Sequence, residues 1–352
     1  MAYASITKPS LHMNTKLYTG TGSSNAITGV GFQPDFTWIK QRSNAENHAL
    51  FDAVRGVTKY IKSDENASEV TEATSLSAFG TDGFTVVSSG KTNTNGRTYA
   101  SWNWKGNGAG SADTSGTINS TVSANTTSGF SIVKYVGDGT GGNNTIAHGL
   151  GVAPDMVIYK NLDTARNWIV YHKSMGATKN LYLDLTNASN TASNTFNNVA
   201  PTSTLLNVND SVGVNESGDN HVAYCFAEKK GYSKFGKYMG NGNDDGPFIY
   251  TGFKPAWVII KSHIGTDNWI VYDSKRYGSN GQGSDAGNAR LYANTSSAED
   301  LTADQISFHS NGFAPTKDYS SINYNDGNYI YMAFAEEPLV ANVGESIPAT
   351  AR

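Results

Sequence analysis

The feature that most constrains this chain is a set of landmarks that recurs three times in the same order. Each set opens with Tyr-x-Gly-x-Gly and continues to a proline, which precedes a short apolar run ending in lysine. The opening motifs begin at Tyr18, Tyr135 and Tyr238, the prolines are Pro34, Pro154 and Pro255, and the lysines are Lys40, Lys160 and Lys261. A period of roughly a hundred residues predicts tandem copies of one folding unit.

The later landmarks keep the same spacing. An asparagine follows each proline by 13 residues, with no gap in any copy: Asn47, Asn167 and Asn268. Each copy then closes on a segment in which apolar residues alternate with others. Because successive side chains of a strand point to opposite faces, each pair from that segment should share a face: Trp102 and Trp104, Tyr224 and Phe226, Met332 and Phe334.

The type of fold follows from these segments. Runs such as residues 257–260 are short, rich in β-branched residues and apolar on both faces, as buried strands are. The intervals between strands are too short for crossover helices, which favours antiparallel pairing, and only 66–76 and 298–305 tolerate a helix. We therefore predict an all-β chain of three tandem antiparallel β-sandwich modules, jelly-roll-like or lectin-like.

The repeat also predicts the domain organisation. Residues 1–16 form an N-terminal arm, and the modules span 17–106, 117–229 and 230–336. The glycine-rich stretch 107–116 has the composition of a flexible linker. Residues 337–352 form an extended tail that is available to lie on a neighbouring chain. The exposed arm and tail together predict a homo-oligomer, with a trimer favoured.

Composition and charge exclude several classes of protein. Charged residues make up 16% of the chain and the net charge is −4, which excludes a broad electrostatic grip on nucleic acid and a basic membrane patch. Cys225 is the only cysteine, so neither an intrachain disulfide nor a cysteine zinc site can form. Without a secretory segment or a long apolar stretch, we expect no membrane insertion and synthesis in a reducing compartment.

Motifs for catalysis are missing from the sequence. It contains no phosphate-binding loop, zinc-protease helix or serine nucleophile elbow, and the glycines of the opening motifs are expected in turns. The scattered histidines, such as His48 and His172, are expected at the surface or at strand ends. When the three copies are aligned, Asp52 and Asp273 occupy the same position, here called a column of the repeat. They should form local pairs with Arg55 and Arg276. We assign no catalytic, cofactor-binding or metal-binding residue.

Two segments leave alternatives open. The turn 240–246 is rich in Asn and Asp, as calcium loops are, but its counterparts have few carboxylates, which favours an ordinary turn. Trp168 and Trp269 share a column next to polar residues and could offer ring faces to a sugar. The apolar residues that follow both tryptophans favour core packing instead.

Several segments resemble a known group of proteins. GFQPDFTWIKQRS from Gly31, HALFDAVRG from His48, the stretch from Tyr224 to Lys261 and YIYMAFAEEPLV from Tyr329 resemble repeat-containing virion proteins of marine tailed bacteriophages, including those of cyanobacteria. The resemblance covers nearly the whole chain and implies a structural, tail-fibre-like component of the particle. It supplies no catalytic residues.

The resemblance and the repeat together lead to one functional expectation. We expect a virion structural protein, made in the bacterial cytoplasm, that forms a tail-associated fibre or receptor-binding component. Its expected partners are other virion proteins and a host surface glycan. The alternatives are a capsid decoration or head-fibre protein and, less favoured, a glycan-degrading tailspike enzyme, which would need two carboxylates about 5–10 Å apart.

Overall fold

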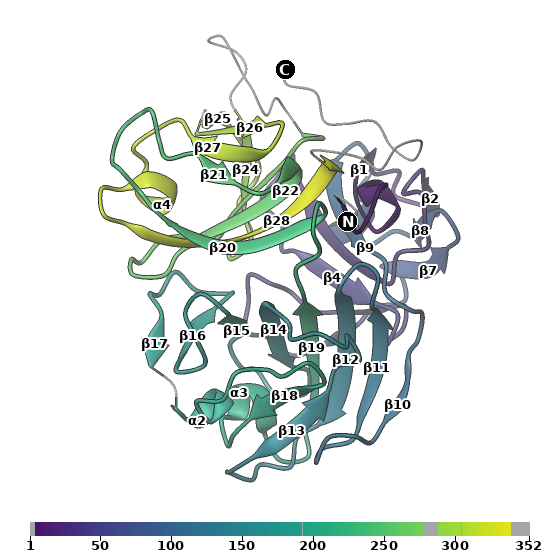
Figure 1. Ribbon diagram of the computed structural model, residues 1–352. Helices are drawn as coiled ribbons and strands as arrows, with labels where there is room; N and C mark the ends of the chain where they lie inside the picture. The colour runs from purple at the N-terminus through teal and green to yellow at the C-terminus, as the bar shows by residue number, and fades with distance from the viewer. Residues whose placement is uncertain (1–3, 192, 277–287, 304, 339–352) are drawn as a thin grey trace.

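The computed structural model describes residues 4–191, 193–276, 288–303 and 305–338, and it is all-β (Figure 1). The paired strands run antiparallel, as the sequence predicted. The described helices are short and lie mainly just before the closing strands, outside both segments expected to tolerate one: η1 (Pro9–Leu11), α1 (Gly90–Asn93), α2 (Ser193–Phe196), α3 (Val212–Asn215) and α4 (Ser320–Asn323).

The first repeat, residues 17–106 with the preceding arm, forms one larger sheet and one smaller sheet. The larger sheet has the order β1 (Met13–Thr19), β9 (Thr98–Trp104), β3 (Phe36–Gln41) and β4 (Ala49–Asp52). The smaller sheet has the order β2 (Asn25–Thr28), β8 (Gly83–Val86) and β7 (Leu76–Gly80), and a short pair joins β5 (Lys59–Tyr60) to β6 (Val70–Thr71).

The second repeat, residues 117–229, has the same central strand order with an additional edge. Its large sheet runs β10 (Ser111–Asp113), β11 (Ser120–Asn125), β12 (Phe130–Val136), β19 (Asn220–Phe226), β14 (Met156–Asn161), β15 (Ile169–His172), β16 (Lys179–Tyr182) and β17 (Asn190–Thr191). Its smaller sheet pairs β13 (Asn144–Ala147) with β18 (Leu205–Val208). The segment 107–116, expected to be a flexible linker, therefore contributes a paired edge strand instead.

The third repeat, residues 230–336, repeats the pattern again. Its large sheet runs β20 (Ser233–Met239), β28 (Asn328–Pro338), β22 (Phe253–Ser262), β23 (Ile270–Asp273), β24 (Asn288–Tyr292) and β25 (Asp300–Ala303). Its smaller sheet has the order β21 (Ile249–Tyr250), β27 (Gly312–Pro315) and β26 (Ile306–His309). Pro255 does not open its strand but lies at a register shift within β22, where a residue without an N–H is tolerated.

The three large sheets face one another around a single shared core (Figure 1). The predicted alternation of the closing strands is confirmed, because one face of each contributes to that core: Trp102 and Trp104, Tyr224 and Phe226, Met332 and Phe334. The opposite face of each large sheet packs in a core of its own repeat. Each repeat thus buries only part of its apolar surface within itself.

Backbone hydrogen bonds join the repeats in a closed ring. In each junction an N–H at the start of β6, β17 or β25 donates to a carbonyl just beyond the lysine of the neighbouring repeat. The three bonds, of 2.7–2.9 Å, run from Glu69 to Leu162, from Ser189 to His263 and from Glu299 to Arg42. The first repeat donates to the second, the second to the third and the third to the first.

The described part of the N-terminal arm packs on its own chain. Ile6 lies in the shared core with 4% of its surface exposed, and the Ser5 N–H donates to the carbonyl of Lys230 at 2.8 Å. The arm was expected to be exposed, whereas Ala4, Ile6 and Pro9 are buried on their own chain. Residues 337 and 338 belong to β28, and the rest of the predicted tail lies outside the described residues.

Candidate functional site

The tryptophan column lies in the shared core. Trp168 and Trp269 have 0% and 1% of their surface exposed, so core packing is confirmed and neither ring can face a sugar. Each indole N–H donates at 2.8 Å to a carbonyl of another repeat, and His48 Nε2 lies 2.9 Å from a third carbonyl. The carbonyls belong to one column: Lys62, Tyr182 and Tyr292. This column therefore holds the repeats together.

The lysine column has the same role. The lysines are completely buried, and burial lowers the pKa of each to about 8. Each ammonium donates to a carbonyl of another repeat: Lys40 to Ser296 at 3.1 Å, Lys160 to Asn66 at 3.2 Å and Lys261 to Thr186 at 3.0 Å. Because carbonyl oxygens occupy the donors, these lysines connect the repeats and do not face a ligand.

The aspartates of the third column form the predicted local pairs with arginine and also accept hydrogen bonds from neighbouring repeats. Asp52 lies 2.5 Å from Arg55 Nε, and Asp273 lies 2.6 Å from Arg276 Nε. The same carboxylates accept hydrogen bonds from the Tyr224 hydroxyl at 2.7 Å and from the Trp102 indole at 2.9 Å, both from other repeats. In the second repeat the column holds His172, whose Nε2 lies 3.2 Å from the Tyr331 carbonyl.

The histidines were expected at the surface or at strand ends, and the second alternative fits His172, which ends β15, and His48, which directly precedes β4. Burial is what the prediction did not include. His48, His148, His172 and His221 are completely buried, and desolvation lowers the pKa of each, that of His172 to about 4. They are buried because they lie at junctions between repeats or between the two sheets of a repeat, which a strand pattern alone does not reveal.

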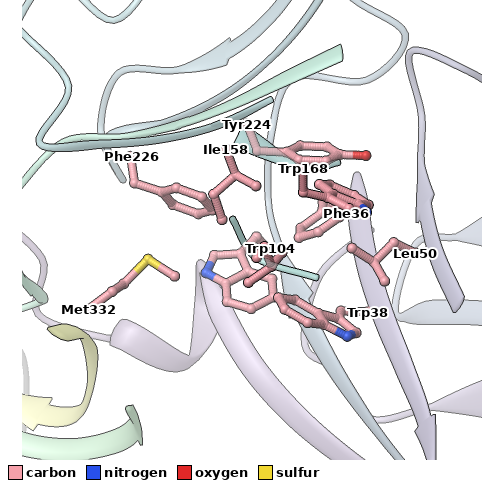
Figure 2. A pocket seen from close by; sticks show the side chains of 10 residues that line it. Phe36, Trp38, Leu50, Trp104, Ile158, Trp168, Tyr224, Phe226 and Met332 are labelled. Atoms are coloured by element: carbon pink, nitrogen blue, oxygen red, sulfur yellow. The ribbon is translucent and has the colours of Figure 1, made fainter. Parts of the chain in front are cut away.

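The shared core encloses a cavity of about 10 Å³ (Figure 2). Its walls come from all three repeats: Phe36, Trp38, Leu50, Trp104, Ile158, Trp168, Leu183, Tyr224, Phe226 and Met332. A space of that size holds at most one water molecule, and apolar walls give a water no partners. The cavity is a packing defect and not a ligand site.

The opening motifs form turns, as predicted. The tyrosine hydroxyl donates at 2.6–2.7 Å to a carbonyl of the short helix before the closing strand, in all three copies. A Cβ on Gly20, Gly137 or Gly240 would lie 2.2–2.3 Å from a carbonyl oxygen, so a side chain cannot fit. A buried asparagine of the helix, Asn323 in the third repeat, accepts from the turn's backbone in each copy.

The acidic turn 240–246 is held in that same way. Asn323 donates to the Asn243 carbonyl at 2.7 Å, and the exposed carboxylate of Asp244 pairs with Lys317 at 2.8 Å. Across the part of the chain that the structure describes, no group of three or more His, Cys, Asp or Glu side chains is placed to hold a metal ion.

An open groove of about 310 Å³ lies at the edge of the third repeat, between the end of β22 and the helix α4. Its lining combines an exposed ring, a carboxylate and hydroxyls: Ser262, Ile264, Gly265, Asp267, Ser320, Tyr324, Gly327 and Tyr329. Tyr324 and Ile264 have 64% and 54% of their surface exposed. Exposed aromatic side chains among the described residues all belong to this repeat: Phe248, Tyr250 and Tyr324.

Charged and polar side chains fill the same position in the other two repeats. In the first repeat Lys91 pairs with Glu46 at 3.2 Å, and Arg97 donates to Asn44 at 2.7 Å. In the second repeat Arg166 pairs with Glu216 at 2.5 Å.

In the third repeat Asp267 occupies the column of Glu46 and Arg166, and small or apolar residues occupy the other columns. Gly265 occupies the column of Asn44, Gly327 that of Arg97, and Tyr324 that of Glu216. The groove is therefore open because two side chains are missing and no ion pair covers it. Sequence reasoning missed these residues, although a comparison of the three copies in this column would have found them.

Residues 8–338 match the model of a family described as a domain of unknown function, DUF7483. The chain belongs to the DUF7483 family. The match includes all three repeats, in agreement with the shared core that makes the DUF7483 domain one structural unit. No curated protein and no solved structure matches the chain. No helix of the described residues is long and apolar enough to cross a membrane.

Proposed function

We propose that this DUF7483 chain is a bacteriophage virion structural protein, a tail-associated fibre or receptor-binding component that presents β-sandwich modules to the host. Each module would be one repeat, with its large and small sheets as the two layers of a jelly-roll-like or lectin-like sandwich. The virion is the corresponding location, and other virion proteins are the partners.

The observation that carries the proposal is the position of the groove relative to the ends of the described chain. Residues 4 and 338 lie together, because a Cβ on Gly231 would come within 2.7 Å of Ala4 and 3.6 Å of Pro338. The groove lies at the other end of β28, next to Tyr329. At about 3.3 Å per residue, the strand separates the two by about 30 Å. Such a chain can attach at one end and present a site at the other.

Cryo-electron microscopy of the phage that encodes the chain tests this proposal. We expect density for the all-β domain on the tail, with residues 4 and 338 toward the particle and the groove outward. Density at capsid hexamers or vertices would instead favour the alternative of a decoration or head-fibre protein. Absence from the purified particle, measured by mass spectrometry, would refute both.

The less favoured candidate is a glycan-degrading tailspike enzyme. Glycosidases use two carboxylates about 5–10 Å apart, and the groove lining includes a single one, Asp267. We therefore propose a binding role without catalysis. The predicted homotrimer is tested by light scattering on the purified chain, for which a monomer at micromolar concentration is the contradicting result.

A further inference from the structure

We propose that the groove of the third repeat binds the pyranose ring of a neutral saccharide. This inference deepens the proposed function and rests on it, because it names the class of host molecule that the presented site would recognise. Three features of the groove support a saccharide ligand: the ring of Tyr324, the carboxylate of Asp267 and the absence of lysine and arginine from the lining residues.

The Tyr324 ring is an exposed apolar platform on a backbone that is held in place. Its backbone N–H donates to the Tyr329 hydroxyl at 2.8 Å, and that hydroxyl donates to the Ser320 carbonyl at 2.6 Å. Tyr99 holds Thr94 in the same way in the first repeat, so the support belongs to the framework. With the backbone fixed, only the two side-chain torsions of Tyr324 remain to be ordered on binding, and the face of the ring can stack on the C–H groups of a sugar.

Asp267 supplies the acceptor for sugar hydroxyls. Its Oδ1 accepts from Ser320 Oγ at 3.0 Å and from Ser321 Oγ at 3.2 Å. Its Oδ2 lies 2.7 Å from the point where a Cβ on Gly265 would stand, so the missing side chain leaves this oxygen facing the hollow. Hydrogen bonds from hydroxyls to a carboxylate are stronger than those between neutral groups.

The charge of the groove selects among small ligands. The lining residues of the groove include one carboxylate and no lysine or arginine; the ammonium of Lys261 lies behind them, buried, and donates to the carbonyls of Ser262 and Gly265. An anionic group such as phosphate would therefore meet the Asp267 carboxylate and find no ammonium or guanidinium group in the lining to bind it. A purely apolar ligand would take water from Asp267 without giving it a partner, which costs free energy. A neutral ring with hydroxyls on its rim and C–H groups on its face satisfies Ile264, Tyr324 and Asp267 together.

Saturation-transfer NMR on the full chain tests the inference. The probes are the methyl pyranosides of glucose, galactose, mannose and N-acetylglucosamine, with inorganic phosphate as a negative probe. We expect transfer to at least one sugar, concentrated on the C–H protons of one ring face. Titration should show that Tyr324→Thr, which places the first repeat's residue in the groove, weakens binding about fivefold.

Two further variants and a matched control sharpen the test. Asp267→Asn should weaken binding by a similar factor, and Gly265→Asn, which restores the side chain of the first repeat, should abolish it. Tyr250→Thr is the control, because Tyr250 is equally exposed, at 58%, in the same repeat but outside the groove lining. It should bind as the wild type does, and unchanged thermal unfolding shows that each variant folds.

The outcomes separate this inference from the proposed function. Lack of transfer to any sugar overturns the inference, as does wild-type binding by Tyr324→Thr or equal loss in Tyr250→Thr. If the chain is found in the particle but binds none of the sugars, only the saccharide inference falls. If the chain binds a sugar through the groove but is absent from the particle, only the proposed function falls.

Discussion

The buried ion pair between Asp52 and Arg55 offers a quantitative test of how the repeats are joined. Both side chains have at most 1% of their surface exposed, and Asp52 also accepts the hydroxyl of Tyr224 from the second repeat. We expect Asp52→Asn, which keeps the size of the side chain, to leave the guanidinium charge of Arg55 buried with a weaker partner.

The expected cost follows from the contacts that remain. Removing one member of a buried pair typically costs about 3–5 kcal/mol of unfolding free energy. Arg55 keeps a second carboxylate, Glu69 at 3.0 Å, which is only 15% exposed. We therefore expect a loss at the lower limit, about 3 kcal/mol.

The second repeat supplies a natural replacement for the pair. His172 and Met175 occupy the columns of Asp52 and Arg55, and Met175 packs against the shared core. The double variant Asp52→His with Arg55→Met removes both charges together, so we expect it to cost less than about 1.5 kcal/mol. The charges should therefore be strongly coupled in a double-mutant cycle.

Urea unfolding followed by tryptophan fluorescence measures these costs, since all six tryptophans are buried. Asp244→Asn is the control, because its pair with Lys317 has side chains 65% and 51% exposed and should contribute little to stability. A cost below about 1 kcal/mol for Asp52→Asn would refute the reasoning. So would a double variant as unstable as the sum of both single variants.

Three more predictions concern the junctions and turns. The buried lysines have a pKa of about 8 in the folded chain, below the ordinary lysine pKa of 10.5 that applies when the chain is unfolded. Their protons therefore leave the folded state first, and stability should rise from pH 8 to 9.5. The gain in unfolding free energy is about 2 kcal/mol per lysine, so Lys160→Met should remove about a third of the total gain measured by urea titrations. A stability that does not change between pH 8 and 9.5 would contradict this prediction. A chain ended after residue 229 should show no cooperative transition in calorimetry, because it leaves the shared core open; a sharp transition would show that two repeats suffice. Gly20→Ala should cost about 2 kcal/mol in unfolding free energy, because its Cβ would lie 2.2 Å from the Thr94 carbonyl oxygen. Gly90→Ala should change the stability little, because no atom lies nearer than 3.7 Å to its Cβ. Equal costs for the two variants would disprove the steric argument.

Much of each sheet could be predicted from the sequence. Alternation in a strand separates two faces, so Trp102 and Trp104 could be placed together without knowing their surroundings. The same pattern does not say what covers a face. Here other repeats cover it, which also explains why His48, next to the start of β4, is buried. Residues 107–116 have a linker's composition, yet pairing with β11 orders part of them.

The groove could not be predicted from any one segment. Residues 262–267 and 320–329 are far apart in the chain, and only the pairing of β22 with β28 brings their ends together. Neither segment contains a motif on its own, because the decisive change is the loss of side chains at Gly265 and Gly327. Their absence becomes meaningful only beside the ion pairs of the other two repeats.

A threefold framework with one open groove sets the valency of the molecule. Three identical grooves on one chain would let it grip a surface at several points and gain avidity. Ion pairs occupy the corresponding position in the first two repeats. If the groove of the third repeat binds as proposed, each chain would therefore bind through one site of this kind, with the affinity of a single small contact. Firm adhesion would then depend on how many chains are displayed side by side, and would increase steeply with their density.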